Sequence, residues 1–159
     1  GGALQFVFIS ANTTGSVGLN MSNNTVQGNG TKGRGLSVGT NSSTTFLGLI
    51  SANNITGCTD IGIRFAIDGN SNAKARFTGN RTLGNLLNAG VALVTVGAGT
   101  PTLGCIFQNN TSDRFNLSGA SGVLQVEELS SFNAASNNTG TLSALNNVID
   151  VPAGSLGIP

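Results

Sequence analysis

Few residues in this sequence are able to carry chemistry. The sequence contains six acids, Asp60, Asp68, Asp113, Glu127, Glu128 and Asp150, and two cysteines, Cys58 and Cys105, but no histidine. Because histidine is missing, the Ser–His and Cys–His pairs of nucleophilic catalysis are excluded. Hydrolysis of glycosidic bonds needs two carboxylates held close together. Glu127 and Glu128 are adjacent in the sequence, and that pair is expected in an exposed turn.

The composition limits the class of protein. The chain has 159 residues, of which 8% are charged and 38% hydrophobic, and its net charge is +1. Such a charge balance gives no electrostatic footprint for nucleic acid or for an anionic membrane. The apolar residues fall in short runs, none of which approaches the roughly 18 residues of a transmembrane helix. We therefore expect one domain over residues 1–159, with short strands and no transmembrane segment.

A repeat organises these short runs. Each cycle has an alternating apolar run, a polar turn, a second apolar run and an asparagine turn. The equivalent starting points, Phe8, Leu36, Ile63, Val91, Phe115 and Leu142, are 28, 27, 28, 24 and 27 residues apart. The asparagine turns at Asn24, Asn53, Asn80 and Asn110 give an independent spacing of 29, 27 and 30 residues. Two markers with one period indicate a repeat architecture.

A unit of about 27 residues with three short strands cannot bury its own apolar face, but it can do so by stacking on its neighbours. The sequence therefore predicts an all-β fold, a parallel β-helix (solenoid) of about five to six rungs. We expect a right-handed coil, as for most parallel strand crossovers. The segment 152–159 breaks the pattern with prolines and glycines and is expected to be an irregular closing segment.

Alternation assigns side chains to the interior. Met21, Ile50, Phe77 and Phe107 form one predicted core column, and Leu19, Gly48, Ala75 and Cys105 form another. The amides of Asn24, Asn53, Asn80 and Asn110 are expected to stack as a ladder that satisfies buried backbone groups. Asn29, Cys58 and Asn85 would form a second column. Because the two cysteines lie at different points of the coil, we expect buried thiols and no disulfide.

The same alignment brings two acids to one side of the coil. Asp60 and Asp113 are 53 residues apart, about two rungs, which would place them roughly 10 Å from each other. Arg64 and Arg114 would lie beside them. We interpret these four residues as paired or solvated surface charge, because no third catalytic group accompanies them. No spacing typical of metal ligands and no cofactor-binding motif occurs, so neither a metal nor a cofactor is expected.

The repeat resembles the pectin-lyase-like parallel β-helix proteins. Gly1-Gly2-Ala3-Leu4 is similar to the GGA-[ILV] motif of bacterial polymorphic outer-membrane proteins. Phe77-Thr78-Gly79-Asn80 and Phe107-Gln108-Asn109-Asn110 are similar to their FxxN motif. The resemblance covers nearly the whole chain and implies a surface or autotransporter passenger domain. Galacturonan hydrolases of this fold use paired aspartates and a histidine, and this sequence lacks both features.

The sequence thus favours a non-enzymatic structural or adhesive module, extracellular or at the cell surface. The expected partners are further copies, stacked end to end through the solenoid ends into a fibre, or other surface proteins. Gly1-Gly2-Ala3-Leu4 would enter the first rung without a cap, so a preceding rung from elsewhere is expected there. The alternative is a protein that binds or cleaves carbohydrates, with glycans as partners. The many Asn-x-Ser/Thr tripeptides are expected from the composition alone and do not by themselves indicate glycosylation.

Overall fold

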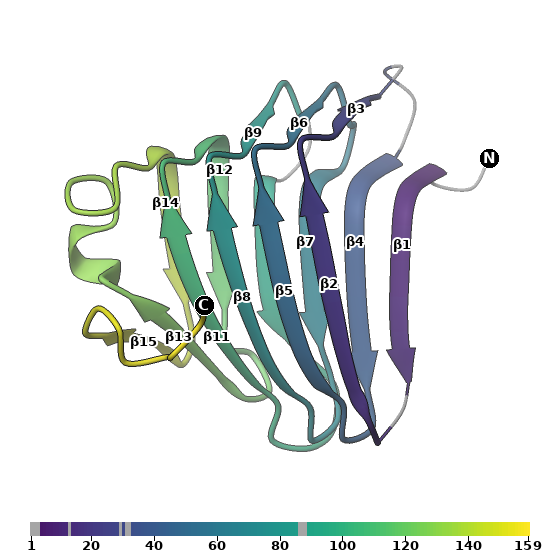
Figure 1. Ribbon diagram of the computed structural model, residues 1–159, viewed down its shortest axis with the longest axis vertical. Helices are drawn as coiled ribbons and strands as arrows, with labels where there is room; N and C mark the ends of the chain where they lie inside the picture. Colours follow the sequence, from purple (N-terminus) through teal and green to yellow (C-terminus); the bar gives the residue numbers. More distant parts are fainter. Residues whose placement is uncertain (1–3, 13, 29, 31–32, 86–88) are drawn as a thin grey trace.

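The alternating runs form parallel strands that coil into a β-solenoid of about five turns (Figure 1). The computed structural model describes residues 4–12, 14–28, 30, 33–85 and 89–159. Each turn contributes strands to two sheets, and every strand pair within the sheets is parallel. The predicted fold class, all-β with about 27 residues per rung, is confirmed.

Sheet A contains the first strand of every rung together with a row of shorter strands. Its strands are β1 (Leu4–Asn12), β4 (Gly33–Asn41), β7 (Ile61–Ile67), β10 (Ala89–Thr95), β12 (Thr111–Ser118) and β14 (Thr139–Leu145), with β3 (Thr25–Gln27), β6 (Asn54–Thr56) and β9 (Arg81–Leu83) as the short row. β12 bridges the two rows, because it pairs with β9 and with β10. In this rung the single strand β12 replaces the short strand, the connector and the long strand of earlier rungs. The missing connector explains the step of 24 residues in the sequence repeat.

Sheet B contains the second strand of every rung. Its order is β15 (Val148–Val151), β13 (Val123–Glu127), β11 (Thr102–Gln108), β8 (Asn72–Thr78), β5 (Thr45–Ser51) and β2 (Ser16–Ser22). The register between these strands is regular: Met21 pairs with Ile50, Ile50 with Phe77, and Phe77 with Phe107. The predicted core column therefore lies in one line across sheet B, and all four of its side chains are buried.

The register of the first strand differs from the predicted one. Val7 pairs with Leu36, while Phe8 pairs with Ser37 and is 61% exposed. The prediction that Phe8 begins the first cycle is therefore wrong by one residue. The reason is that residues 6–9 are all apolar, so alternation does not distinguish the inner from the outer face there. The later starting points pair as predicted, from Leu36 to Leu142.

Aromatic rings fill the interior between the sheets. Phe77 and Phe107 are stacked with ring centroids 4.9 Å apart, and Phe65 meets Phe77 edge to face at 5.2 Å. A further ring, that of Phe132, continues the line of Phe77 and Phe107, since its centroid lies 5.2 Å from that of Phe107. Phe132 follows the 3₁₀ turn η1 (Leu129–Ser131) and is 3% exposed. We call Leu129–Phe132 the plug.

Candidate functional site

The ladder asparagines occupy one line along the solenoid. Asn53 Oδ1 accepts hydrogen bonds from the backbone nitrogen and from Nδ2 of Asn24, both at 3.0 Å. The same two bonds join Asn53 to Asn80 at 3.1 and 2.9 Å, and Asn80 to Asn110 at 3.0 and 3.0 Å. Asn138 continues the line, with both bonds from Asn110 at 3.0 Å. Among the residues that the structure describes, the ladder thus has five members where four were expected from the sequence.

A left-handed residue precedes each ladder asparagine. Asn23, Ala52, Gly79, Asn109 and Asn137 all have φ between 50° and 64°. That conformation turns the chain so that the last four ladder asparagines point inward, where each Nδ2 donates to a backbone carbonyl of the preceding rung, for example Asn80 to Ile50 at 2.7 Å. Asn24 is exposed, and its Nδ2 donates to Ser22 of its own rung. The Phe-x-x-Asn pattern therefore has a structural cause: a core residue, a turn and a ladder asparagine.

A second column lies in the connectors between rungs. Asn85 Oδ1 accepts from the Cys58 backbone nitrogen at 3.0 Å, and Asp113 Oδ2 accepts from the Asn85 backbone nitrogen at 3.1 Å. Asp113 therefore holds the chain of the preceding rung. Asn29, which was expected in this column, lies outside the described residues.

Both cysteines are buried and unpaired. Cys58 lies in a connector and Cys105 in the interior, between Ala75 and Val126 in register. Burial raises the pKa of the Cys58 thiol and raises that of Cys105 well above its usual range. A thiol held protonated and out of contact with solvent is a poor nucleophile.

Asp60 and Asp113 have different partners. Asp60 forms an ion pair with Arg34, with Nε and Oδ2 2.8 Å apart. Arg64 lies near this pair on sheet A, where burial and the Arg34 charge lower its pKa and the Asp60 charge opposes them. Arg114 is exposed, in the strand segment after Asp113. Asp60 and Asp113 thus each contact a neighbouring rung, Asp60 through Arg34 and Asp113 through the backbone of Asn85.

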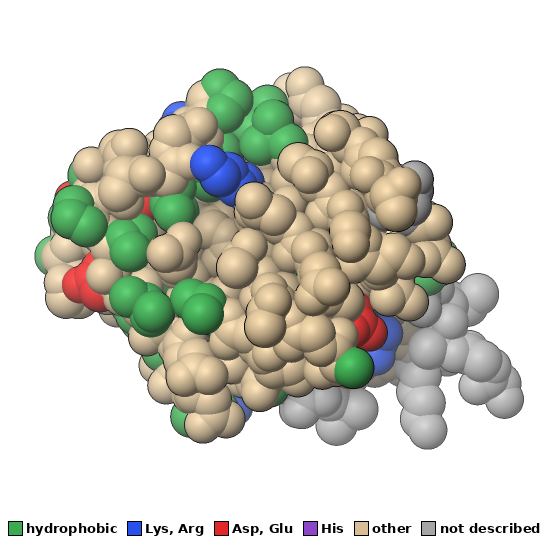
Figure 2. All heavy atoms as spheres, turned by 90° about the horizontal axis from the view of Figure 1, so that it is seen from below, with side chains coloured by type: hydrophobic (Ala, Val, Ile, Leu, Met, Phe, Trp, Pro, Cys, Tyr) green, Lys and Arg blue, Asp and Glu red, His purple; other side chains and the backbone are tan. Residues whose placement is uncertain are grey.

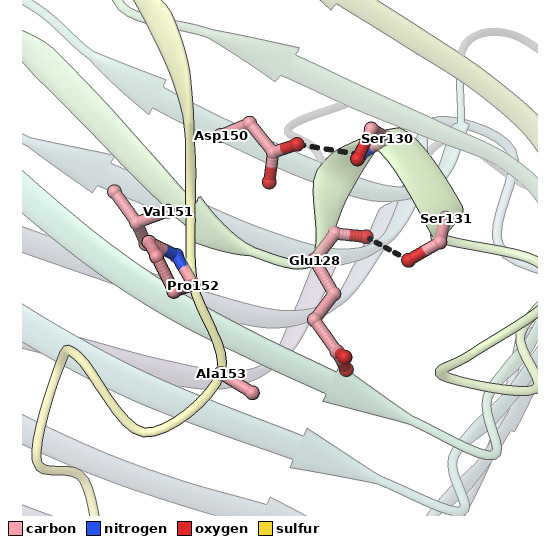
Figure 3. A pocket seen from close by; sticks show the side chains of 7 residues that line it. All are labelled: Glu128, Ser130, Ser131, Asp150, Val151, Pro152 and Ala153. Atoms are coloured by element: carbon pink, nitrogen blue, oxygen red, sulfur yellow. Dashed lines mark hydrogen bonds between the residues drawn. The ribbon is translucent and has the colours of Figure 1, made fainter.

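A hollow of about 350 Å³ at the C-terminal end brings together two further acids (Figure 3). Glu128, Asp150, Ser130 and Ser131 line it. The Asp150 carboxylate accepts from the backbone nitrogens of Leu129 at 2.8 Å and Ser130 at 3.1 Å. A hydrogen bond from the Ser130 side chain, together with these amides, lowers the pKa of Asp150, and desolvation opposes this shift. General acids in glycosidases have raised pKa values, whereas the pKa of Asp150 is lowered. Its hydrogen bonds instead fit a role in holding η1.

The two ends of the solenoid differ. At the N-terminal end, the inward side chains Val7, Ile9, Val17 and Leu19 pack on the core yet remain partly exposed. At the other end, the plug fills the interior, and Asp150 stands where the register continues the line of Cys105 and Val126. Figure 2 shows hydrophobic side chains gathered at the left, the side of β13–β15 in Figure 1, and there Leu145 and Ile149 are exposed.

The segment 152–159 is irregular and runs back across the outer face of sheet B, with its end beside β8 and β11 in Figure 1. Leu156 and Ile158 are buried there against Ile106. We call this outer face of sheet B the outer groove. The sequence marks 152–159 as irregular, but its position on the groove was not expected.

The described residues contain no group of three or more Cys, Asp or Glu side chains placed to hold a metal ion. Within those same ranges, no helix has the length and apolar character needed to span a membrane.

The chain was compared with known proteins in three ways. No protein-family model matches the sequence, and no curated protein or solved structure matches it either. What the chain does must therefore be inferred from its own surfaces.

Proposed function

We propose that this protein is a non-enzymatic structural or adhesive module in which a further rung covers the N-terminal end of the coil, and that residues 1–159 on their own take this rung from a second copy. The observation that carries the proposal is the partial exposure of Val7, Ile9, Val17 and Leu19, the first members of the core columns. A solenoid whose edge strands are unpaired has free backbone donors and acceptors beside an apolar surface. Another rung placed there would bury both.

The difference between the two ends favours a closed assembly. A fibre would require the C-terminal end to accept the next N-terminal rung, but there the inward line of Cys105 and Val126 ends at Asp150, whose carboxylate is bonded to η1. Two copies that meet through their N-terminal ends need one self-complementary surface only. The expected assembly is therefore a dimer, because an apolar rung stacked on the C-terminal end would cover the Asp150 carboxylate.

The distribution of charge supports a role without catalysis. Asp60 pairs with Arg34, Asp113 binds the connector of Asn85, and Asp150 binds η1. These carboxylates stabilise the coil and do not converge on one cavity. The low charge and the resemblance to surface β-helix domains support an extracellular or cell-surface location.

Sedimentation velocity over a broad concentration range, with negative-stain electron microscopy of the concentrated sample, tests the proposal. We expect a monomer–dimer equilibrium that shifts toward the dimer at high concentration. A monomer at every concentration would overturn the proposed association. Digestion of a polysaccharide panel by the purified chain would overturn the proposed lack of catalysis and would favour the carbohydrate alternative.

A further inference from the structure

The outer groove carries an apolar strip that crosses the strands. Leu47 and Leu49 of β5 and Ile106 of β11 point outward, and Leu156 and Ile158 pack in the same cluster. Leu156 also lies over Gly104, where a Cβ atom would come within 3.1 Å of Leu156 Cδ2. The segment thus lies in close contact with the sheet.

Charged side chains of the groove hold the backbone of this segment. Lys74 Nζ donates to the Leu156 carbonyl at 2.5 Å, and Arg76 Nη2 donates to the Ile158 carbonyl at 2.8 Å. Glu127 accepts from the backbone nitrogens of Gly154 at 3.0 Å and Leu156 at 2.9 Å. These four bonds involve main-chain groups of a segment that turns at residues 153–156, where Gly154 and Gly157 have positive φ. They therefore fit a peptide with the same turn, glycines at these two positions and apolar residues at the two buried positions.

The groove extends on both sides of Pro159. One hollow of about 380 Å³ is lined by Leu49, Arg76 and Thr78, and another of about 340 Å³ by Leu47 and Lys74. Pro159 borders both. In the first hollow, Arg76 Nε and Thr78 Oγ1 are buried without a hydrogen-bond partner. Buried polar groups are almost always hydrogen-bonded, so a peptide carbonyl in the hollow would satisfy these atoms if the two side chains turned toward it.

We propose that the outer groove is a docking site for a glycine-containing peptide segment of a partner protein that turns as Gly154–Pro159 does, with apolar side chains at the positions of Leu156 and Ile158. The segment Gly154–Pro159 occupies part of this site in cis. Lys74 and Arg76 face main-chain carbonyls and Glu127 faces main-chain amides, so an uncharged peptide backbone satisfies charges of both signs. A glycan would find no aromatic ring on this face among the described residues, since the outward positions of sheet B carry none.

Docking in trans competes with the attached segment. A tethered ligand acts at a high effective concentration, commonly millimolar, so a partner binds tightly only when the cis segment is released. The groove is a different surface from the N-terminal end. Failure of peptide docking would therefore not contradict the proposed dimer. A chain that stays monomeric would likewise not contradict peptide docking.

The test uses the chain with both Leu156→Ser and Ile158→Ser. These changes leave the sheet residues of the groove unchanged and weaken the packing of the segment Gly154–Pro159 on them. The probe is the synthetic peptide Val-Pro-Ala-Gly-Ser-Leu-Gly-Ile-Pro with an N-terminal fluorescein, followed by fluorescence anisotropy. We expect saturable binding, at least tenfold tighter than to the unchanged chain. Adding Leu49→Asp to the double variant should weaken binding at least tenfold. A peptide with serine in place of leucine and isoleucine should not bind.

Circular dichroism and thermal melting establish that the double variant is folded. If the double variant is not folded, the test is hydrogen exchange in the unchanged chain. Excess peptide should displace the cis segment and so speed exchange at the Gly154 and Leu156 amides; unchanged exchange would overturn the proposal. A folded double variant that fails to bind the peptide would overturn the proposal. The proposal would also be overturned if the double variant bound an oligosaccharide but not the peptide, and if Leu49→Asp abolished the oligosaccharide binding.

Discussion

Asn110 Oδ1 lies 3.0 Å from the backbone nitrogen of Asn80 and 3.0 Å from its Nδ2. Asn80 Nδ2 also donates to the carbonyl of Ile50, at 2.7 Å. One side chain therefore joins three successive rungs. Since buried backbone groups must find partners, the asparagine ladder satisfies the turn at which the coil leaves sheet B.

Replacing the central ladder residue should be costly. Asn80→Ala removes the acceptor of the Asn53 backbone nitrogen and of Asn53 Nδ2, and the donor to Ile50. Unsatisfied buried polar groups cost about 1–3 kcal/mol each, so we expect a loss of about 3 kcal/mol in the free energy of unfolding. The control is Asn24→Ala at the exposed end of the ladder, with an expected loss of about 1 kcal/mol. Denaturant titration measures both, and equal losses would contradict the ladder's role.

The turn before the ladder should depend on backbone conformation. Gly79 has φ 64°, and a Cβ atom there would meet nothing closer than the Ala52 nitrogen at 4.0 Å. Gly79→Ala should therefore destabilise the chain by about 1 kcal/mol through the left-handed conformation alone. Gly18→Ala is the matched control, because a Cβ atom at Gly18 would have no neighbour within 4 Å and Gly18 has no positive φ. Its thermal midpoint should stay unchanged or rise slightly. Equal effects at the two glycines would refute the conformational explanation.

The plug should contribute strongly to stability. Phe132 is 3% exposed and packs against the rings of both Phe107 and Phe115. Phe132→Ala should cost about 3–5 kcal/mol, as for other buried phenylalanines. Phe8→Ala removes the same ring from a site that is 61% exposed and should change the free energy of unfolding by less than about 0.5 kcal/mol. A small loss at Phe132 would show that the plug is peripheral.

The contact between Asp150 and η1 should depend on pH. Because its pKa is lowered in the folded chain, this carboxylate stabilises η1 above the ordinary aspartate pKa, about 3.9. The stabilisation is lost as the pH falls through the lower, native value. The amide resonances of Leu129 and Ser130 should titrate with a midpoint below about 3.9, and Asp150→Asn should abolish that step. A midpoint at or above the ordinary value would contradict the hydrogen-bonded geometry.

Much of the fold could be predicted because the signals were local. The columns of Met21 and Ile50 follow from alternation, and the ladder follows from one asparagine per period. Phe8 was misplaced because its strand is apolar on both faces. Asn138 and Phe132 were missed because an insertion separates them by six residues instead of three. The dipeptide Asn137-Asn138, which parallels Asn109-Asn110, was the available signal.

The surfaces were harder to predict than the core. The packing of Leu156 against Ile106 joins residues 50 positions apart, and no periodicity marks such a contact. Glu127 was expected in an exposed turn but is buried, because Gly154 and Leu156 fold over it. That prediction for Glu127 was wrong for a tertiary reason. The pairing of Asp60 with Arg34 likewise depends on the register between adjacent rungs.

The central claim is that the N-terminal end binds a second copy, and one matched pair of variants tests it. Ile9 points inward at this end, while Phe8 on the same strand points outward. A lysine on the inward face of an edge strand blocks further pairing. In sedimentation velocity at high concentration, the unchanged chain and Phe8→Lys should be dimeric, and Ile9→Lys, shown to be folded by circular dichroism, should be monomeric. An unchanged chain that stays monomeric, or an Ile9→Lys variant that still dimerises, would contradict the proposed function.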